Sequence, residues 1–172
     1  QRTDYPRGGA VSLRCRGVRE LRIRKPGWCD RCTVSMDYTL EAGYLVIKEP
    51  EAEVRIDFDM APFLVSANPR VWENNGKAAL QRGPVVYCAE GIDNPAPNLN
   101  ALYIDRHLQT EEHGHPLFSL PALSVKGFAE EPAEALYRKF SDSLVPVTLE
   151  FIPYHAFANR GETDMHVWLN CR

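Results

Sequence analysis

Hydrophobic and polar side chains alternate along much of this chain with a period of two residues. In the clearest case, Val54, Ile56, Phe58 and Met60 share one face of residues 53–60, and charged side chains occupy the other face. This alternation is typical of an antiparallel strand with one face in a core and the other in solvent. Further strands are predicted at residues 10–16, 20–24, 44–48, 63–67, 77–80, 85–89, 102–105, 122–128, 147–154 and 165–169.

Turn-forming residues separate the predicted strands. Pro26-Gly27 follows one strand, and the Asn-rich segments 74–76 and 159–161 each end in a glycine that accepts left-handed backbone. Residues 132–140 begin with a proline followed by good helix formers, so a short helix and an extended connection both remain open there. Many short strands between turns predict an all-β fold with little helix.

We expect two consecutive antiparallel β-sandwich domains of jelly-roll type. The irregular, proline- and asparagine-containing stretch 90–98 suggests the boundary, which gives a first sandwich over residues 1–90 and a second over residues 91–172. The first sandwich is expected to lack its first strand, because the chain opens directly on the turn-like residues 5–9. The sequence also starts without Met or a secretory signal pattern, which favours a truncated chain.

Composition narrows the class of partner. With 172 residues, 44% of them hydrophobic, the chain is long enough to bury a core. The formal net charge of −3 gives no reason to expect nucleic acid or an anionic membrane as partner. No apolar run approaches the roughly 20 residues that a membrane span needs. The odd number of cysteines, five with scattered spacing, favours reduced thiols and a cytoplasmic location.

The sequence shows no convincing catalytic or metal-binding constellation. Cys29 and Cys32 form a Cys-x-x-Cys pair, but a structural zinc site needs further ligands and no second pair is present. The histidines of residues 113–115 lie in a polar stretch that we interpret as a surface loop. Asp57 and Asp59 share a strand face with Arg55, which indicates solvated charges rather than a paired acid and base. We therefore predict no catalytic, cofactor-binding or metal-binding residue in this chain.

Several aromatic and arginine side chains are candidates for structural or interface roles. Trp28, Trp72 and Trp168 could together offer a stacking platform for a sugar, although a place in a core or interface is favoured for them. Arginines next to turns can form forked hydrogen bonds to carbonyls or a carboxylate, and a tyrosine hydroxyl can anchor a corner. The candidates are Trp28, Arg82, Tyr87, Tyr154, Arg160 and Trp168.

Three stretches of the sequence resemble a known enzyme family. The first joins residues 1–13 to residues 21–29, the second is residues 75–90 with the Asp-Asn pair that follows, and the third joins residues 151–161 to residues 165–169. Their content and order resemble the region downstream of the catalytic barrel in glycoside hydrolase family 127, the bacterial-type β-L-arabinofuranosidase family. The departures are small: Lys25 stands where an apolar residue is usual, and Arg7 where an aromatic residue is common.

The resemblance implies a parent enzyme with an N-terminal (α/α)6 barrel followed by β-sandwich domains. That barrel would hold zinc, a cysteine nucleophile within a Cys-Cys motif, and a Glu acid/base. This chain has no Cys-Cys motif, and Cys29 matches the family's Pro-x-Trp motif instead, so no catalytic residue carries over. The expected role is a non-catalytic, structural region whose partner is the parent's barrel, with homo-oligomerisation also open. The competing hypotheses are a carbohydrate-binding module and a self-sufficient hydrolase or metal protein.

Overall fold

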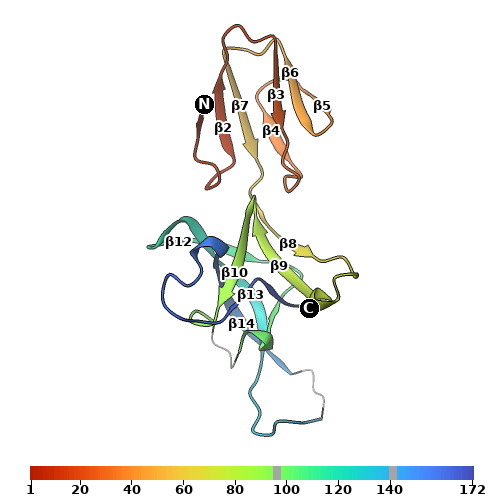
Figure 1. Ribbon diagram of the computed structural model, residues 1–172, viewed down its shortest axis with the longest axis vertical. Coiled ribbons are helices and arrows are strands. Elements are labelled where there is room, and N and C mark those ends of the chain that lie inside the picture. The colour runs from red at the N-terminus through yellow and green to blue at the C-terminus, as the bar shows by residue number, and fades with distance from the viewer. Residues whose placement is uncertain (95–97, 140–142) are drawn as a thin grey trace. The chain divides into compact units, whose positions relative to one another are not determined.

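The computed structural model describes residues 1–94, 98–139 and 143–172 (Figure 1). Its regular structure there is almost entirely β-strand, with three short 3-10 helices, and this confirms the predicted all-β class. The chain forms two compact units, Gln1–Ala61 (unit 1) and Pro62–Arg172 (unit 2).

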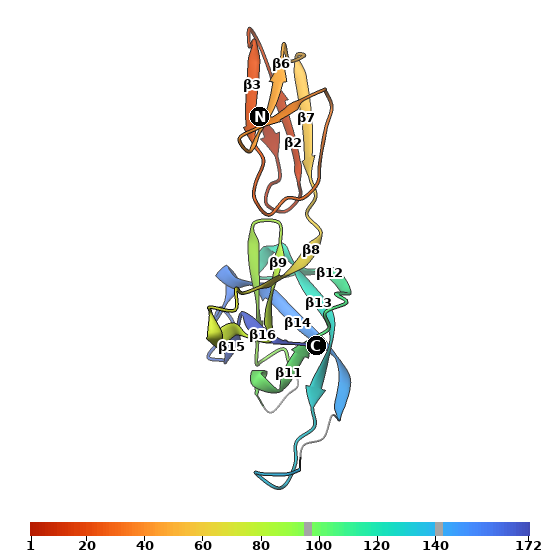
Figure 2. The same cartoon turned by 90° about the vertical axis from the view of Figure 1, so that its right-hand side faces the viewer.

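Unit 1 contains two antiparallel sheets, which Figures 1 and 2 show from two sides. The first sheet has the order β1-β2-β7-β4 and the second the order β3-β6-β5. Their strands are β1 (Arg2–Thr3), β2 (Ala10–Arg14), β3 (Glu20–Arg24), β4 (Cys32–Val34), β5 (Thr39–Glu41), β6 (Tyr44–Lys48) and β7 (Glu53–Phe58).

The core of unit 1 lies between its two sheets. Alternate residues of β7, namely Val54, Ile56 and Phe58, are buried together with Leu45 and Ile47 of β6. The charged residues between them along β7 are exposed, as the period-two pattern predicted. Burying large apolar side chains contributes about 1.5–3 kcal/mol for each one, which makes this shared core the main support of the sandwich.

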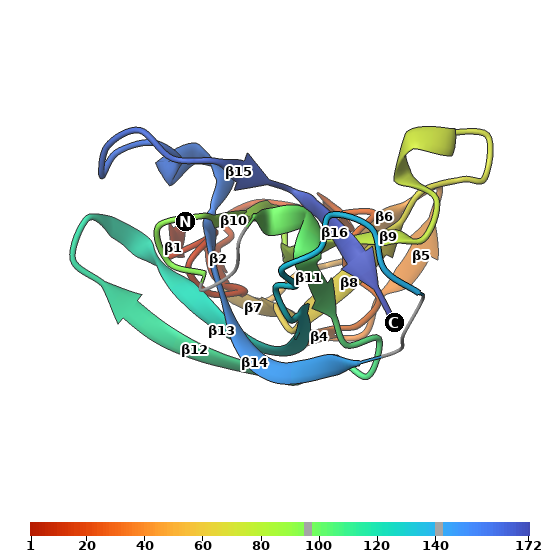
Figure 3. The same ribbon diagram turned by 90° about the horizontal axis from the view of Figure 1, so that it is seen from below.

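In unit 2, nine strands form one sheet that folds over its own core. The path runs β15-β10-β14-β13-β11-β16-β9-β8, with β12 paired to β13, and β9 also pairs with β10. Figure 3 shows β10, β14, β13, β11 and β16 around a common interior. The strands are β8 (Pro62–Ser66), β9 (Lys77–Arg82), β10 (Val85–Glu90), β11 (Leu102–Ile104), β12 (Thr110–His115), β13 (Phe118–Glu130), β14 (Leu144–Pro153), β15 (Met165–His166) and β16 (Trp168–Cys171), and the 3-10 helices are η1 (Trp72–Asn74), η2 (Leu99–Ala101) and η3 (Tyr154–Ala156).

Unit 2 has an inner and an outer apolar cluster. The inner one fills the folded sheet and includes Leu80, Tyr87 and Phe151, all without exposed surface. The outer one joins Cys88 of β10, Ala122 of β13 and Ile152 of β14 on the opposite face of the same strands. Residues 154–167, called the strap below, cover that outer face with Ala156, Phe157, Met165 and Val167.

The structure differs from the sequence-based expectations at three places. It divides the chain between Ala61 and Pro62, whereas the stretch near residue 90 lies inside unit 2, because β9 and β10 pair within the same sheet as all later strands. Residues 132–139 form no helix, and residue 140 lies outside the described residues. The histidines of residues 113–115, interpreted as a loop, belong to β12, which pairs with β13. The jelly-roll connectivity stays a prediction.

No helix in the part of the chain that the structure describes is long and apolar enough to cross a membrane.

Gly9, the residue before β2, lies so close to the backbone of β7 that there is no room for a side chain. A Cβ atom at this position would lie 1.8 Å from the carbonyl oxygen of Phe58, whereas one at Gly27 would meet nothing within 4 Å. We expect Gly9→Ala to lower the free energy of unfolding by about 1–3 kcal/mol through overpacking, and Gly27→Ala to change it by less than about 0.5 kcal/mol. Urea unfolding followed by circular dichroism measures both. Equal midpoints for the two variants would contradict the proposed steric limit.

Candidate functional site

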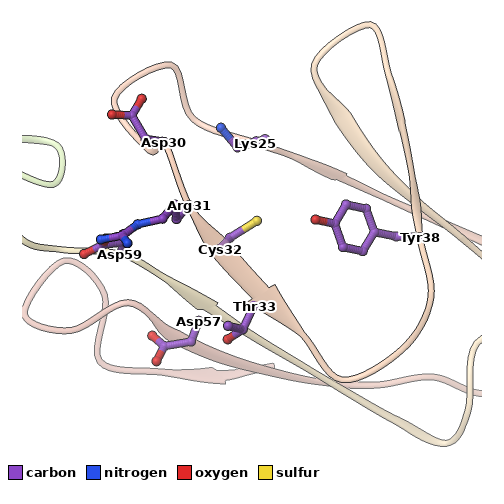
Figure 4. A pocket seen from close by; sticks show the side chains of 8 residues that line it. All are labelled: Lys25, Asp30, Arg31, Cys32, Thr33, Tyr38, Asp57 and Asp59. Atoms are coloured by element: carbon purple, nitrogen blue, oxygen red, sulfur yellow. The ribbon is translucent and has the colours of Figure 1, made fainter.

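The candidate functional site is an open hollow of about 680 Å³ in unit 1. Three parts of the unit form it: the loop after β3, strand β4 with the end of β7, and the loop before β5. Figure 4 shows the lining side chains, which are Lys25, Asp30, Arg31, Cys32, Thr33, Tyr38, Asp57 and Asp59.

Strand pairing places two of these polar side chains next to each other. Thr33 of β4 lies directly opposite Asp57 of β7 in the antiparallel register. Because Ile56 and Phe58 enter the core, Asp57 must point to the other face of β7. Both side chains are exposed, and Figure 4 shows them side by side. The register of β4 on β7 therefore builds this side of the hollow.

An ion pair closes one rim of the hollow. The Arg31 guanidinium donates hydrogen bonds of 2.9 and 3.2 Å to Asp59 Oδ2. The backbone N–H of Ala61 donates to Asp59 Oδ1 at 3.0 Å, and this bond, followed by the Arg31 bond, lowers the pKa of Asp59. On another side, Lys25 Nζ donates to the carbonyl oxygen of Cys29. Two of the cationic groups are thus already engaged by unit 1 itself.

Asp59 in the hollow and Cys29 beside it have pKa shifts opposite to those that catalysis requires. A carboxyl that acts as a general acid near neutral pH needs a raised pKa, and that of Asp59 is lowered. Burial raises the pKa of the nearby Cys29 thiol, the opposite of what a nucleophilic or redox-active cysteine requires. The Cys29 Sγ donates instead to the carbonyl oxygen of Arg31, at 2.9 Å. Within the described residues, no three His, Cys, Asp or Glu side chains are grouped to hold a metal ion.

Of the candidates named from the sequence, Trp28 lies in the core of unit 1. Its indole ring is stacked with Tyr5 at a centroid distance of 6.4 Å and meets Phe58 edge-on at 6.2 Å. It packs against the buried side chains of both sheets. This position leaves Trp28 unsuited to a sugar-stacking platform.

Arg82 of β9 and Tyr87 of β10 are buried residues of the folded sheet of unit 2. Tyr87 is fully buried, and its hydroxyl donates to the carbonyl oxygen of Pro121 at 2.9 Å. Burial is the main cause that raises the pKa of Tyr87 to about 12. The buried Arg82 side chain donates from Nε to Glu112 of β12 at 2.7 Å. Tyr87 thus links β10 to β13, and Arg82 links β9 to β12, which are pairs of strands that do not neighbour each other in the sheet.

Arg160 fastens the strap to the end of β10. Its guanidinium donates to Glu90, whose side chain is fully buried, and to both carboxylate oxygens of Asp93. The hydrogen bonds to Asp93, and then to Glu90, raise the pKa of Arg160 against the opposing effect of burial. The backbone N–H of Ala158 completes the group with a 2.8 Å bond to Glu90. Arg160, Glu90 and Asp93 are called the clasp below.

Tyr154 and Trp168 border a separate shallow depression on unit 2. Tyr154 is about half exposed and Trp168 is partly buried. The other lining residues are Lys77, Met165, His166 and Val167. The predicted candidates are therefore distributed over different places of the two units, and none of them lines the hollow of unit 1.

A Ser, Glu and His cluster on unit 2 was not expected from the sequence. Ser124 Oγ donates to Glu150 Oε1 at 2.7 Å, and His113 Nε2 lies 2.9 Å from Glu150 Oε2. A hydrolytic triad needs the histidine between the serine and the acid, so that it can take the serine proton. Here the carboxylate lies in the middle, so the histidine does not contact the serine and cannot take its proton. The cluster cross-links β12, β13 and β14.

Comparison with known proteins identifies the family. Residues 62–170 match the C-terminal domain of glycoside hydrolase family 127. The chain, two all-β units without an assembled catalytic centre among the described residues, belongs to this family of glycoside hydrolases.

Three relatives show how much of such proteins the chain represents. A non-reducing end β-L-arabinofuranosidase of Bifidobacterium longum is 32% identical over 98% of the chain and 29% of its own length. The solved structure of a family 127 β-L-arabinofuranosidase from Geobacillus stearothermophilus T6 is 34% identical, with a TM-score of 0.84 over all of the chain and 30% of its own. A third structure, a family 127 β-arabinofuranosidase, is 28% identical with a TM-score of 0.79, over 31% of its length. The chain thus spans less than a third of each.

The buried hydroxyl of Tyr87 makes stability depend on alkaline pH. Its pKa is about 12 in the folded chain and about 10 in an unfolded one. The folded state therefore holds this proton more tightly, so the contribution is intact below pH 10 and is lost as the pH rises from 10 to 12. We expect Tyr87→Phe to make the fall in unfolding free energy over this range less steep than in the wild type, as measured by urea unfolding at successive pH values. Parallel curves would contradict the assignment.

Removing the clasp should loosen the strap. Arg160→Ala leaves the buried Glu90 carboxylate without its cation, a change that costs about 3–5 kcal/mol. Cys88 lies under the strap without exposed surface, so its labelling by a thiol reagent, followed by peptide mass spectrometry, should become faster. The control is Arg55→Ala, which breaks the exposed pair with Glu53 and should change stability by less than about 0.5 kcal/mol. Unchanged Cys88 labelling in Arg160→Ala would contradict this role.

Proposed function

We propose that this chain is the non-catalytic, structural region of a retaining glycoside hydrolase that acts on β-L-arabinofuranosyl glycans. The observation that carries the proposal is the alignment of nearly the whole chain with less than a third of two β-L-arabinofuranosidases. In the parent protein, a separate (α/α)6 barrel would supply zinc, the thiolate nucleophile and the acid/base. The two units would pack against this barrel, shape its rim and take part in any oligomer. The five free cysteines support a cytoplasmic location.

The chemistry of the chain's own side chains supports a structural role. Burial raises the pKa of Cys88 to about 12 and also raises that of Cys171, so both thiols stay protonated near neutral pH. Thiol nucleophiles work as thiolates and need the opposite shift. The strongest ion group, the clasp, has its carboxylates occupied by Arg160 and by backbone. These groups stabilise the fold and leave no activated pair.

Assays of the chain alone and of the full-length protein test the proposal. With an aryl β-L-arabinofuranoside as substrate, we expect turnover by the full-length protein and none by the chain alone, since the reactive groups would lie in the barrel. Elemental analysis should find zinc only in the full-length protein. Turnover or stoichiometric zinc in the chain alone would show that it is a self-sufficient enzyme, and an inactive full-length protein would remove the substrate assignment.

A further inference from the structure

We infer that the hollow of unit 1 is a binding site for a neutral sugar. It lies outside the segment that matches the family's C-terminal domain, and none of the residues named from the sequence as structural or interface candidates lines it. The choice of an arabinofuranosyl sugar as its ligand rests on the proposed function. The binding site itself follows from the geometry and charge of the lining side chains.

Several polar groups of the hollow are free to bind a ligand. Within the described part of the chain, no side chain or backbone group hydrogen-bonds the side chains of Asp57, Thr33 or Tyr38. Thr33 and Asp57 stand together on the outer face of paired strands, whereas Tyr38 extends toward Cys32 on the other side of β4 (Figure 4). A carboxylate accepts hydrogen bonds, and the two hydroxyls both donate and accept them. This mixture matches the hydroxyl groups of a sugar, each of which donates and accepts.

The charges of the hollow select against ions. The carboxylates of Asp57 and Asp30 repel an anion, and the two cations that line the hollow are already bound, Arg31 to Asp59 and Lys25 to the Cys29 carbonyl. A metal cation meets the ammonium of Lys25 at the same place, and no metal-binding group is formed by the described residues. A neutral, hydroxyl-rich ligand meets neither repulsion. It gains hydrogen bonds to a carboxylate, which are stronger than those between neutral groups.

Tyr38 adds an apolar surface to these polar groups. About 43% of its surface is exposed, in a loop where the hydroxyl end points toward Lys25 and Cys32. The C–H faces of a sugar ring pack on an aromatic face, while the tyrosine hydroxyl remains available for a hydrogen bond. Tyr38 and Asp57 therefore lie on either side of β4 and would bind different parts of a ligand.

Titration of the complete chain, labelled with ¹⁵N, tests this inference. Methyl β-L-arabinofuranoside is the probe, and inorganic phosphate and calcium chloride are the ionic comparisons. We expect the sugar to shift the amide signals of residues 30–33, 38 and 57–59 in a saturable manner, and the two ions to leave them in place. Asp57→Ala should weaken sugar binding about tenfold, the loss of one hydrogen bond to a charged group, and Tyr38→Ala should weaken it more than Tyr38→Phe.

Glu53→Ala is the matched control. Glu53 lies on the same exposed face of β7 as Asp57, but it pairs with Arg55 and does not line the hollow. Sugar binding should therefore be unchanged in this variant. The inference is overturned if the sugar shifts none of these signals, if phosphate or calcium shifts them instead, or if Asp57→Ala and Glu53→Ala bind alike. If the sugar does not bind, and the chain alone shows neither turnover nor zinc, the proposed function still stands. Hydrolysis of the probe by the chain alone would overturn the proposed function itself.

Discussion

The period of two along each strand is the constraint on which the rest of this structure depends. A residue that enters the core sends both of its neighbours to the opposite face. In β7, the burial of Val54, Ile56 and Phe58 therefore determines that Asp57 faces outward, where Thr33 of β4 lies opposite to it. The hollow of unit 1 is a consequence of its core, since a shift of register by one residue would bury the aspartate and expose the apolar side chains.

The ion pairs of the chain differ in what they can do for stability. Arg31 has 85% of its side chain exposed, and a pair of this kind contributes about 0–1 kcal/mol, which makes its effect on the hollow one of orientation and charge. The clasp is different, because the Glu90 side chain has no exposed surface and would be left as a buried charge without Arg160. The first pair shapes a surface, whereas the second holds the strap over Cys88 and its apolar neighbours.

Local pattern explains how much of the fold could be predicted from the sequence. The long alternating segment of residues 53–60 was found because burial acts there on every second residue. The short strands β4 and β5 were missed, since three residues are too few to show a period. The boundary was expected near residue 90 because proline and asparagine gather there. The division after Ala61 has no comparable turn signal and depends on which strands pair later in the chain.

The candidate site was harder to predict, because its parts come together only in the folded unit. The sequence identified Arg160 as a residue that could bind a carboxylate, but its partners, Glu90 and Asp93, are about 70 residues earlier in the chain. The hollow draws on the loop after β3, β4, the end of β7 and Tyr38, and no motif links them. Reactivity follows the same logic, since a pKa depends on what folding places around a group. Burial has raised the pKa values of Cys29 and Cys88, so the residue types that suggested chemistry in the sequence act in the fold as packing groups, and recognition of a ligand falls to the exposed polar face.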